Sequence, residues 1–195
     1  MGAALEGTGR PFLVTAGMGA ATEDDEGDAS NARHPSEKAT LALASRGVRA
    51  ALVRLPPSVH GDGDHGLVPM LIAVARAKGV SAFIGDGLNR WPAVHRLDAA
   101  PLYRLVLEKG AAGARYHAVG EEAVATKDIA GVIGRRLKLP VVSVAKAEAV
   151  AHFGFLGHFF GRDVPASSAK TRQLLGWQPT HTGLLEDLES GSYFK

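Results

Sequence analysis

The chain has 195 residues, 46% of them hydrophobic and 22% charged, which is typical of a globular protein with one core and a small additional lobe. Its formal net charge is only +2, and its 22 lysines and arginines are spread along the sequence, which argues against nucleic-acid binding. The lack of cysteine excludes disulfides and thiolate metal sites, and the lack of long apolar runs argues against membrane contact, so we expect a cytoplasmic protein.

The first part of the chain has the pattern of a strand, a helix and a second strand. Gly2 to Gly9 has the composition of a helix end, which Pro11 prevents from continuing. Phe12 to Thr15 is an apolar run bounded by proline and glycine, as in a parallel strand buried on both faces. A helix is expected from Ser36 to about Ser45 and a buried strand from Arg49 to Leu55. This order predicts a βαβ unit of a doubly wound parallel sheet, and hence an α/β fold.

An acidic stretch separates the first strand from that helix. It runs from Thr22 to Asn31, is rich in small residues, and carries five carboxylates: Glu23, Asp24, Asp25, Glu26 and Asp28. Small polar residues between two regular elements predict a mobile loop, and a solvated linker is the favoured interpretation.

The rest of the chain alternates short strands with helices. A glycine-rich loop, Gly61 to Gly66, leads into it, and the Asp86-Gly87 pair predicts a hairpin turn. Strands are expected at 82–84, 91–95, 115–119 and 141–144, and helices at 67–78, 98–109, 126–137, 145–156, 168–175 and 184–188.

Four segments carry a resemblance to a known family. They are the run Phe12 to Thr15, Lys38 placed four residues after His34, the run Arg54 to Gly61, and Trp91 to His95 followed by Asp98. Together they resemble the extended or atypical short-chain dehydrogenase/reductases, the NAD-dependent epimerase/dehydratases. A closing run, Leu174-Leu175-Gly176-Trp177-Gln178-Pro179, also looks like that family's C-terminal pattern, so the resemblance extends from Phe12 to Phe194.

The resemblance implies a fold, a cofactor and a class of substrate. The fold would be the C-terminal half of a doubly wound, Rossmann-like sheet with a small α/β substrate lobe. Residues 1–66 would form the partial dinucleotide-binding half, and residues 67–195 the substrate lobe with interleaved Rossmann elements. The activity would be NAD- or NADP-dependent oxidoreduction or epimerisation at a carbinol carbon of a sugar or nucleotide sugar.

By the same resemblance, three residues are the catalytic candidates. The family uses a strand-end Ser or Thr, a Tyr, and a Lys four residues later, which lowers the pKa of the phenol and contacts the cofactor ribose. Lys38 and Thr15 occupy the Lys and Ser/Thr positions, while His34 stands where the family has Tyr. Histidine also exchanges protons near neutral pH, so His34 is the candidate proton donor. The alternatives are a surface histidine and a threonine that only packs.

The run Arg54 to Gly61 supplies the candidate cofactor contacts. It resembles the family segment Pro-x-Asn-Val-Tyr-Gly, which passes beneath the nicotinamide into the substrate site. Pro56 and Pro57 would fix an extended backbone that meets the cofactor, and Ser58 would contact both cofactor and substrate. His60 would present a polar group to the substrate; the alternative is a rigid exit from the strand.

The remaining substrate candidates follow Gly87. By resemblance, Trp91 would stack on a base or sugar, Arg90 would meet a phosphate, and His95 would face the cleft. The alternative is that Trp91 packs at a domain interface while Asp98 caps the next helix.

No metal site is expected from the sequence. His60, Asp62, Asp64 and His65 have metal-binding composition, but their spacing matches neither a zinc motif nor a calcium loop.

The sequence contains no Gly-x-Gly-x-x-Gly turn after a first strand, the feature that binds a dinucleotide pyrophosphate. We therefore expect this chain alone to bind NAD or NADP weakly. Two alternatives stay open beside the enzyme: a truncated, non-catalytic remnant, and a nucleotide-sugar-binding module. The first strand's outer edge would lack a neighbour, which favours association into a homo-oligomer.

Overall fold

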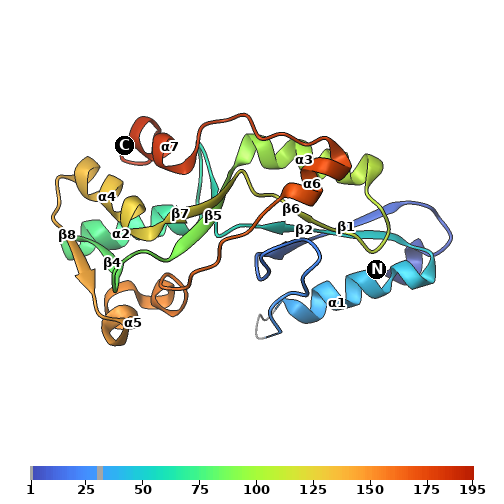
Figure 1. Ribbon diagram of the computed structural model, residues 1–195, viewed down its shortest axis with the longest axis horizontal. Coiled ribbons are helices and arrows are strands. Elements are labelled where there is room, and N and C mark those ends of the chain that lie inside the picture. Colours follow the sequence, from blue (N-terminus) through green and yellow to red (C-terminus); the bar gives the residue numbers. More distant parts are fainter. Residues whose placement is uncertain (1, 30–32) are drawn as a thin grey trace.

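Three small sheets follow one another along the molecule in the computed structural model, which describes residues 2–29 and 33–195 (Figure 1). The first is parallel, with strand order β1-β2-β6, the second has the order β3-β5-β7, and the third pairs β4 with β8. The strands are β1 (Pro11–Gly17), β2 (Arg49–Leu55), β3 (Ser58–His60), β4 (Ser81–Ile84), β5 (Arg90–His95), β6 (Arg115–His117), β7 (Glu121–Ala125) and β8 (Val141–Val144).

Helices cover these sheets on both sides. Figure 1 shows α3 and α6 on one side of the first sheet and α1 on the other. The α-helices are α1 (His34–Ala42), α2 (Leu67–Lys78), α3 (Arg96–Lys109), α4 (Thr126–Leu137), α5 (Ala149–Phe153), α6 (Ala169–Leu175) and α7 (Leu184–Ser190). Short 3-10 helices add η1 (Gly2–Leu5), η2 (Ala44–Arg46), η3 (Lys146–Glu148) and η4 (Gly154–His158). Among the described residues, none of the helices has the length and apolar character needed to cross a membrane.

The α/β fold class expected from the sequence is confirmed. β1 and β2 are parallel over their full lengths, from the pair Pro11 and Arg49 to the pair Gly17 and Leu55, with α1 between them in the chain. β2 is buried along its interior, as its continuous apolar sequence predicts. Gly47 ends the helical segment before β2 in the left-handed conformation, with φ of 72°, which glycine adopts without a steric cost.

Three local expectations were wrong. Phe12, Leu13 and Val14 on β1 are half-buried instead of enclosed on both faces, whereas β1 lies at the edge of its sheet as expected. The Asp86-Gly87 turn does not join a hairpin, because β4 pairs with β8 and β5 pairs with β3 and β7. β3 and β7 were not expected as strands. The strands that pair with β3 and β7 lie about 30 residues or more away in the sequence, so no local pattern predicts the pairing.

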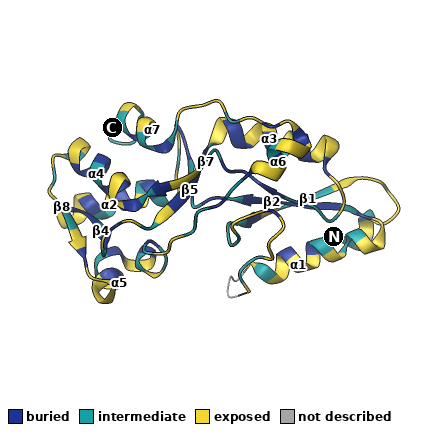
Figure 2. Ribbon diagram, viewed as in Figure 1, coloured by how far each residue is buried: buried dark blue, intermediate teal, exposed yellow. Residues whose placement is uncertain are grey.

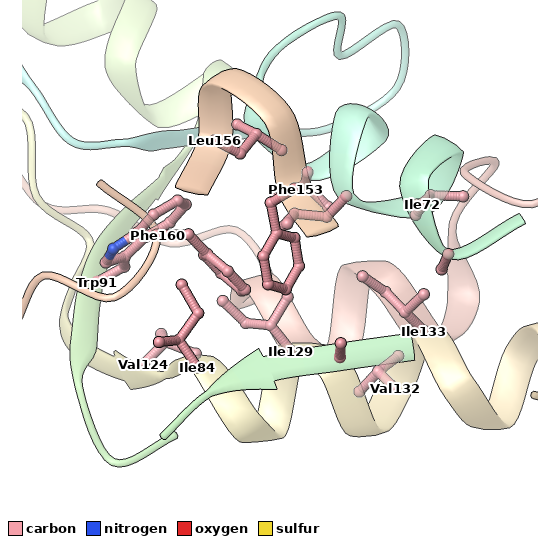
Figure 3. Packing of buried hydrophobic residues seen from close by; sticks show 14 of the residues in the cluster. Ile72, Ile84, Trp91, Val124, Ile129, Val132, Ile133, Phe153, Leu156 and Phe160 are labelled. Atoms are coloured by element: carbon pink, nitrogen blue, oxygen red, sulfur yellow. The ribbon is translucent and has the colours of Figure 1, made fainter. Parts of the chain in front are cut away.

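Two hydrophobic clusters hold the molecule together. One lies under the first sheet and α3 and includes Trp177. The other fills the region between α2, α4, α5 and the third sheet, where Trp91 stacks on Phe159 at a centroid distance of 6.1 Å and meets the edge of Phe160 at 5.1 Å. Figure 3 shows Phe153 and Phe160 packed side by side in this second cluster, and Figure 2 shows buried residues concentrated along the strands.

The acidic stretch is attached to the rest of the protein and is not a solvated linker. Glu23 is only 4% exposed and accepts hydrogen bonds from the backbone amide and hydroxyl of Thr171, both at 2.7 Å. Asp24 pairs with Lys170 and Asp28 with Arg162. These contacts tie the loop to the C-terminal part of the chain, although residues 30 and 31 of the stretch lie outside the described residues.

A buried cation joins β2, α1, the acidic stretch and β6. The side chain of Arg54 is fully buried; its Nε donates to Glu37 Oε1 at 2.6 Å and its Nη1 donates to the carbonyl oxygen of Asp25 at 3.0 Å. The same Nη1 lies 3.3 Å from His117 Nε2, and His117 Nδ1 lies 2.8 Å from the carbonyl oxygen of Ser167. His117 is therefore held as the neutral Nδ1–H tautomer, which accepts from Arg54 and donates to Ser167.

We expect the stability of this fold to fall as the pH is lowered below neutral. Burial lowers the pKa of His117 from the ordinary value of 6.5. The unfolded chain then binds more protons than the folded one at pH values below 6.5, so the stabilisation is complete above that pH and is lost as the pH falls through the folded pKa. Urea unfolding between about pH 7.5 and pH 5 measures it.

The variant His117→Gln keeps an acceptor for Arg54 and a donor for Ser167 without a titrating ring. It should unfold at a lower urea concentration at neutral pH and show a weaker pH dependence. An unfolding free energy that stayed constant or rose toward pH 5 in the parent protein would contradict the assignment.

Candidate functional site

A pocket of about 300 Å³ lies against the first turns of α1. It is lined by Glu26, Gly27, His34, Glu37, Lys38, Leu41, Ala42 and Arg115. His34 is the first residue of α1, and Lys38 follows one turn later, so both side chains reach the same side of the helix. The structure thus brings the predicted proton donor and the predicted lysine together.

The polar atoms of His34 and Arg115 are not all paired in this pocket. Among the described residues, His34 Nδ1 and Arg115 Nε are buried without a hydrogen-bond partner. Unpaired buried polar atoms are rare in folded proteins and mark positions where a ligand or water supplies the partner. Lys38 also lines the pocket and is exposed, so its ammonium group is accessible beside the nitrogens of His34 and Arg115.

Gly27 packs closely over this end of α1. A Cβ atom on residue 27 would lie 2.5 Å from Glu37 Oε2 and 3.4 Å from His34 Nδ1, so the close approach requires glycine. Glu37, beside Lys38 in the sequence, is held by Arg54. The orientation of α1, and with it the position of His34, therefore depends on the buried Arg54 pair.

Thr15 is not part of this group. Its hydroxyl is hydrogen-bonded to the hydroxyl of Tyr103 at 2.8 Å, and Tyr103 belongs to α3. α3 and α1 cover opposite sides of the first sheet (Figure 1). The side chain of Thr15 therefore faces away from His34 and Lys38, in agreement with the packing alternative.

The predicted cofactor segment connects β2 to β3. Pro56 is buried and Pro57 half-buried, and Ser58 begins β3 with only 2% of its surface exposed. The Ser58 hydroxyl is buried without a hydrogen-bond partner among the described residues. A buried hydroxyl in that state is a second candidate contact for a ligand atom.

The structure gives Arg90 and Trp91 partners within the protein. Trp91 is 1% exposed inside the cluster of Figure 3, so the packing alternative describes its indole better than stacking on a ligand. Arg90 forms a two-point ion pair with Asp163, with Nε to Oδ1 at 3.0 Å and Nη2 to Oδ2 at 2.8 Å. Arg90 remains exposed, so its guanidinium is accessible although paired.

The other two predicted substrate residues, His60 and His95, lie in a second pocket of about 220 Å³. The two pockets share no lining residue. The rings of His60 and His95 are 5.2 Å apart and nearly perpendicular, and His95 stacks on His181 at 4.8 Å. The second pocket is lined by His60, Ala93, Val94, His95, Asp98, Gly120, Glu121, Pro179, His181, Thr182 and Gly183.

Carboxylates stand at both ends of this row of imidazoles. His60 Nδ1 lies 2.8 Å from Asp187 Oδ2, and His181 Nδ1 lies 2.7 Å from Asp98 Oδ1. Burial acts to raise the pKa of Asp98, but hydrogen bonds from the ring and amide of His181 and from the amide of Thr180 lower it overall. Burial, and then the neighbouring His60, lowers the pKa of His95, which favours the neutral ring.

Several residues of both pockets were missed from the sequence. Arg115 and His181 line the pockets and Asp187 contacts His60, but all three lie outside the motifs and carry no local signal of a site. Asp98 was expected only as a helix cap. Its carboxylate instead accepts the backbone amides of Thr180 and His181, which ties the C-terminal segment to α3.

Comparison with known sequences identifies two yeast relatives, while no family model matches the chain. The chain is 51% identical over 202 residues to the uncharacterized protein C2A9.02 of Schizosaccharomyces pombe, and it covers 68% of that protein. It is 49% identical over 194 residues to the uncharacterized protein YLL056C of Saccharomyces cerevisiae, of which it covers 65%. The chain therefore spans about two-thirds of the length of these relatives.

Solved structures share the fold at low sequence identity. MoeE5, in complex with UDP-glucuronic acid and NAD, matches 97% of this chain and 66% of its own with a TM-score of 0.70 and 19% identity. A UDP-galactose 4-epimerase matches 95% of this chain and 63% of its own with a TM-score of 0.69 and 18% identity. The dTDP-glucose 4,6-dehydratase DesIV of Streptomyces venezuelae, with NAD bound, matches 92% and 57%, with a TM-score of 0.66 and 22% identity.

These matches have two consequences. The α/β architecture is the Rossmann-like fold of these epimerases and dehydratases. The chain corresponds to only a part of each of their chains. By its sequence identity and coverage, the chain belongs to the family of the fission yeast protein C2A9.02.

Proposed function

We propose that the protein acts in NAD- or NADP-dependent oxidoreduction or epimerisation at a carbinol carbon of a sugar or nucleotide sugar, as a member of the short-chain dehydrogenase/reductases. The observation that carries the proposal is that His34 and Lys38 both line the α1 pocket, where His34 Nδ1 is buried without a hydrogen-bond partner among the described residues. The fold shared with nucleotide-sugar enzymes supports the class of substrate.

His34 would exchange a proton with the substrate hydroxyl, and Lys38 would supply the positive charge that the reaction needs beside it. An imidazole titrates near pH 7 and can both take and return a proton. The ammonium of Lys38 would contact the cofactor ribose. The nicotinamide supplies hydride transfer when it is bound.

The residues between β2 and β3 would contact the cofactor. Pro56 and Pro57 connect β2 to β3, with a bend at Pro57, and the hydroxyl of Ser58, unpaired among the described residues, is available to a polar ligand atom. Arg90 would meet a phosphate only by releasing or sharing Asp163. Thr15 and Trp91 are not included, because Thr15 faces α3 and Trp91 is buried.

The proton-donor assignment can be tested in a longer form of the protein that carries a dinucleotide-binding turn. His34→Phe should lower turnover about 10²–10⁴-fold while cofactor affinity stays nearly unchanged, since only the transition state uses the proton. His34→Tyr should retain or raise activity. Steady-state kinetics with nucleotide-sugar substrates measures both.

His158→Phe is the matched control, because His158 is an exposed histidine on η4 outside the α1 pocket. Lys38→Met should lower both rate and cofactor affinity, and Lys109→Met, at the exposed end of α3, should lower neither. Turnover of His34→Phe equal to that of the parent would mean that His34 is not the proton donor. Absence of turnover in the parent itself would favour the binding-module alternative.

Cofactor binding by the 195-residue chain itself should be weak. Calorimetric titration with NAD and with NADP should give dissociation constants above about 10 μM, which corresponds to about 7 kcal/mol of binding free energy. A tighter constant would mean that a surface other than a glycine-rich turn binds the pyrophosphate.

Self-association through the edge of β1 is the final expectation for this chain. The edge presents unpaired backbone groups and half-buried apolar side chains. Light scattering should show a mass that rises with concentration, and Val14→Lys should reduce the rise. Leu97→Lys, which replaces an exposed leucine on α3, should not reduce it. A monomer at all concentrations would contradict this expectation.

A further inference from the structure

Two histidines and a carboxylate converge beside the second pocket from three separate elements. His60 and His95 end the parallel strands β3 and β5 and are register partners, and Asp187 lies on α7. One donor atom from each residue lies within 4.8 Å of the other two. We propose that His60, His95 and Asp187 bind a divalent first-row transition-metal ion.

The orientation of the side chains supports a shared ligand. His60 Nδ1 and Asp187 Oδ2 are 2.8 Å apart. The ring of His95 stands at 82° to that of His60, and its Nε2 lies toward Gly61, where a Cβ atom would be 3.0 Å away. The Nε2 atom of His95 thus lies close to the residue that follows His60.

Two imidazoles and one carboxylate are a donor set that suits zinc and its neighbours in the first transition row. Ligand atoms of a tetrahedral Zn²⁺ lie about 3.3–3.5 Å from one another, since each bond is about 2.0–2.1 Å long. The donor atoms of His60 and Asp187, 2.8 Å apart, would separate by roughly half an ångström, and the donor atom of His95 would approach by up to about 1.5 Å.

Burial makes a bound cation favourable here. His60 is 1% exposed and Asp187 9%, so the carboxylate is largely removed from water. Among the described residues, the ion-pair partner of Asp187 is His60 and no lysine or arginine, so a divalent ion would offset the buried negative charge. Because His60 and His95 also line the 220 Å³ pocket, coordination positions not filled by the protein would open toward it.

The metal-like composition of the glycine-rich loop does not produce a competing site. Asp62 accepts a hydrogen bond from Ser192, and Asp64 accepts from Gly66 and from Tyr193. Among the described residues 60–65, only His60, the last residue of β3, takes part in the convergence.

Binding of a metal ion by His95 would remove one hydrogen bond. His95 Nδ1 accepts the backbone N–H of Leu97 at 3.2 Å. A metal on Nε2 leaves the ring proton on Nδ1, so this bond at the start of α3 would be lost. The bond is long, and the net contribution of one such hydrogen bond is small beside that of a multidentate metal site.

Titration of the untagged, metal-stripped protein with Zn²⁺ tests the proposal, with Co²⁺ as a spectroscopic probe. We expect saturable binding of one ion per chain and visible absorption of the bound Co²⁺. Asp187→Asn keeps the size of the side chain and an oxygen facing His60 but removes the charge, and it should weaken Zn²⁺ binding at least tenfold. Glu186→Gln, the neighbouring exposed carboxylate on α7, should bind as the parent does.

Circular dichroism decides whether Asp187→Asn is folded. If it is not, His95→Gln is measured in its place against the same tenfold criterion, with His65→Gln, an exposed histidine of the loop, as its control. The proposal is overturned by the absence of saturable one-to-one binding in the parent. It is equally overturned if the charge or ring substitution leaves the affinity unchanged, or if the control variants lose affinity to the same degree.

Discussion

The arrangement of the elements around α1 depends on the hydrogen bonds of the buried Arg54 guanidinium. Arg54 lies on β2, without exposure to solvent, and joins α1 through Glu37, the acidic stretch through Asp25, and β6 through His117. Removing one partner of a buried ion pair leaves an uncompensated charge and costs about 3–5 kcal/mol. The pair therefore fixes relative positions far more strictly than hydrophobic packing alone, because its hydrogen bonds tolerate little change in direction.

The α1 pocket follows from this arrangement. Glu37 is adjacent to Lys38 and one turn below His34, so its bond to Arg54 sets the rotation of the helix. Gly27 then approaches Glu37 and His34 closely enough to exclude any larger residue. The acidic stretch contributes carboxylates that are bound to the C-terminal segment, and Glu23 accepts from Thr171 on α6. The pocket itself is lined by described residues of the segment 26–42 and by Arg115, and the C-terminal part of the chain contributes by holding the acidic stretch in place.

The C-terminal segment forms the second pocket by similar means. Asp98 accepts the amides of Thr180 and His181, and Asp187 on α7 meets His60 at the end of β3. Carboxylates that accept backbone amides hold a segment without regular structure, where hydrophobic burial alone would leave its path undetermined. As a result, the rings of His60, His95 and His181 come into contact. They line the second pocket, which shares no lining residue with the α1 pocket.

The sequence by itself determined the elements whose signals are local. A buried apolar run predicted β2, and the helices predicted over 67–78 and 126–137 match α2 and α4. The four-residue spacing singled out His34 and Lys38, although the helix was expected to begin at Ser36 and α1 begins at His34. Only the tertiary structure decided what depends on distant partners: the pairing of β4 with β8, the burial of Trp91, the turn of Thr15 toward Tyr103, and the convergence of His60, His95 and Asp187. The physical reason is that a side chain's direction and its hydrogen-bond partner are set by the elements packed around it, and no local spacing encodes contacts between segments that lie far apart in the sequence.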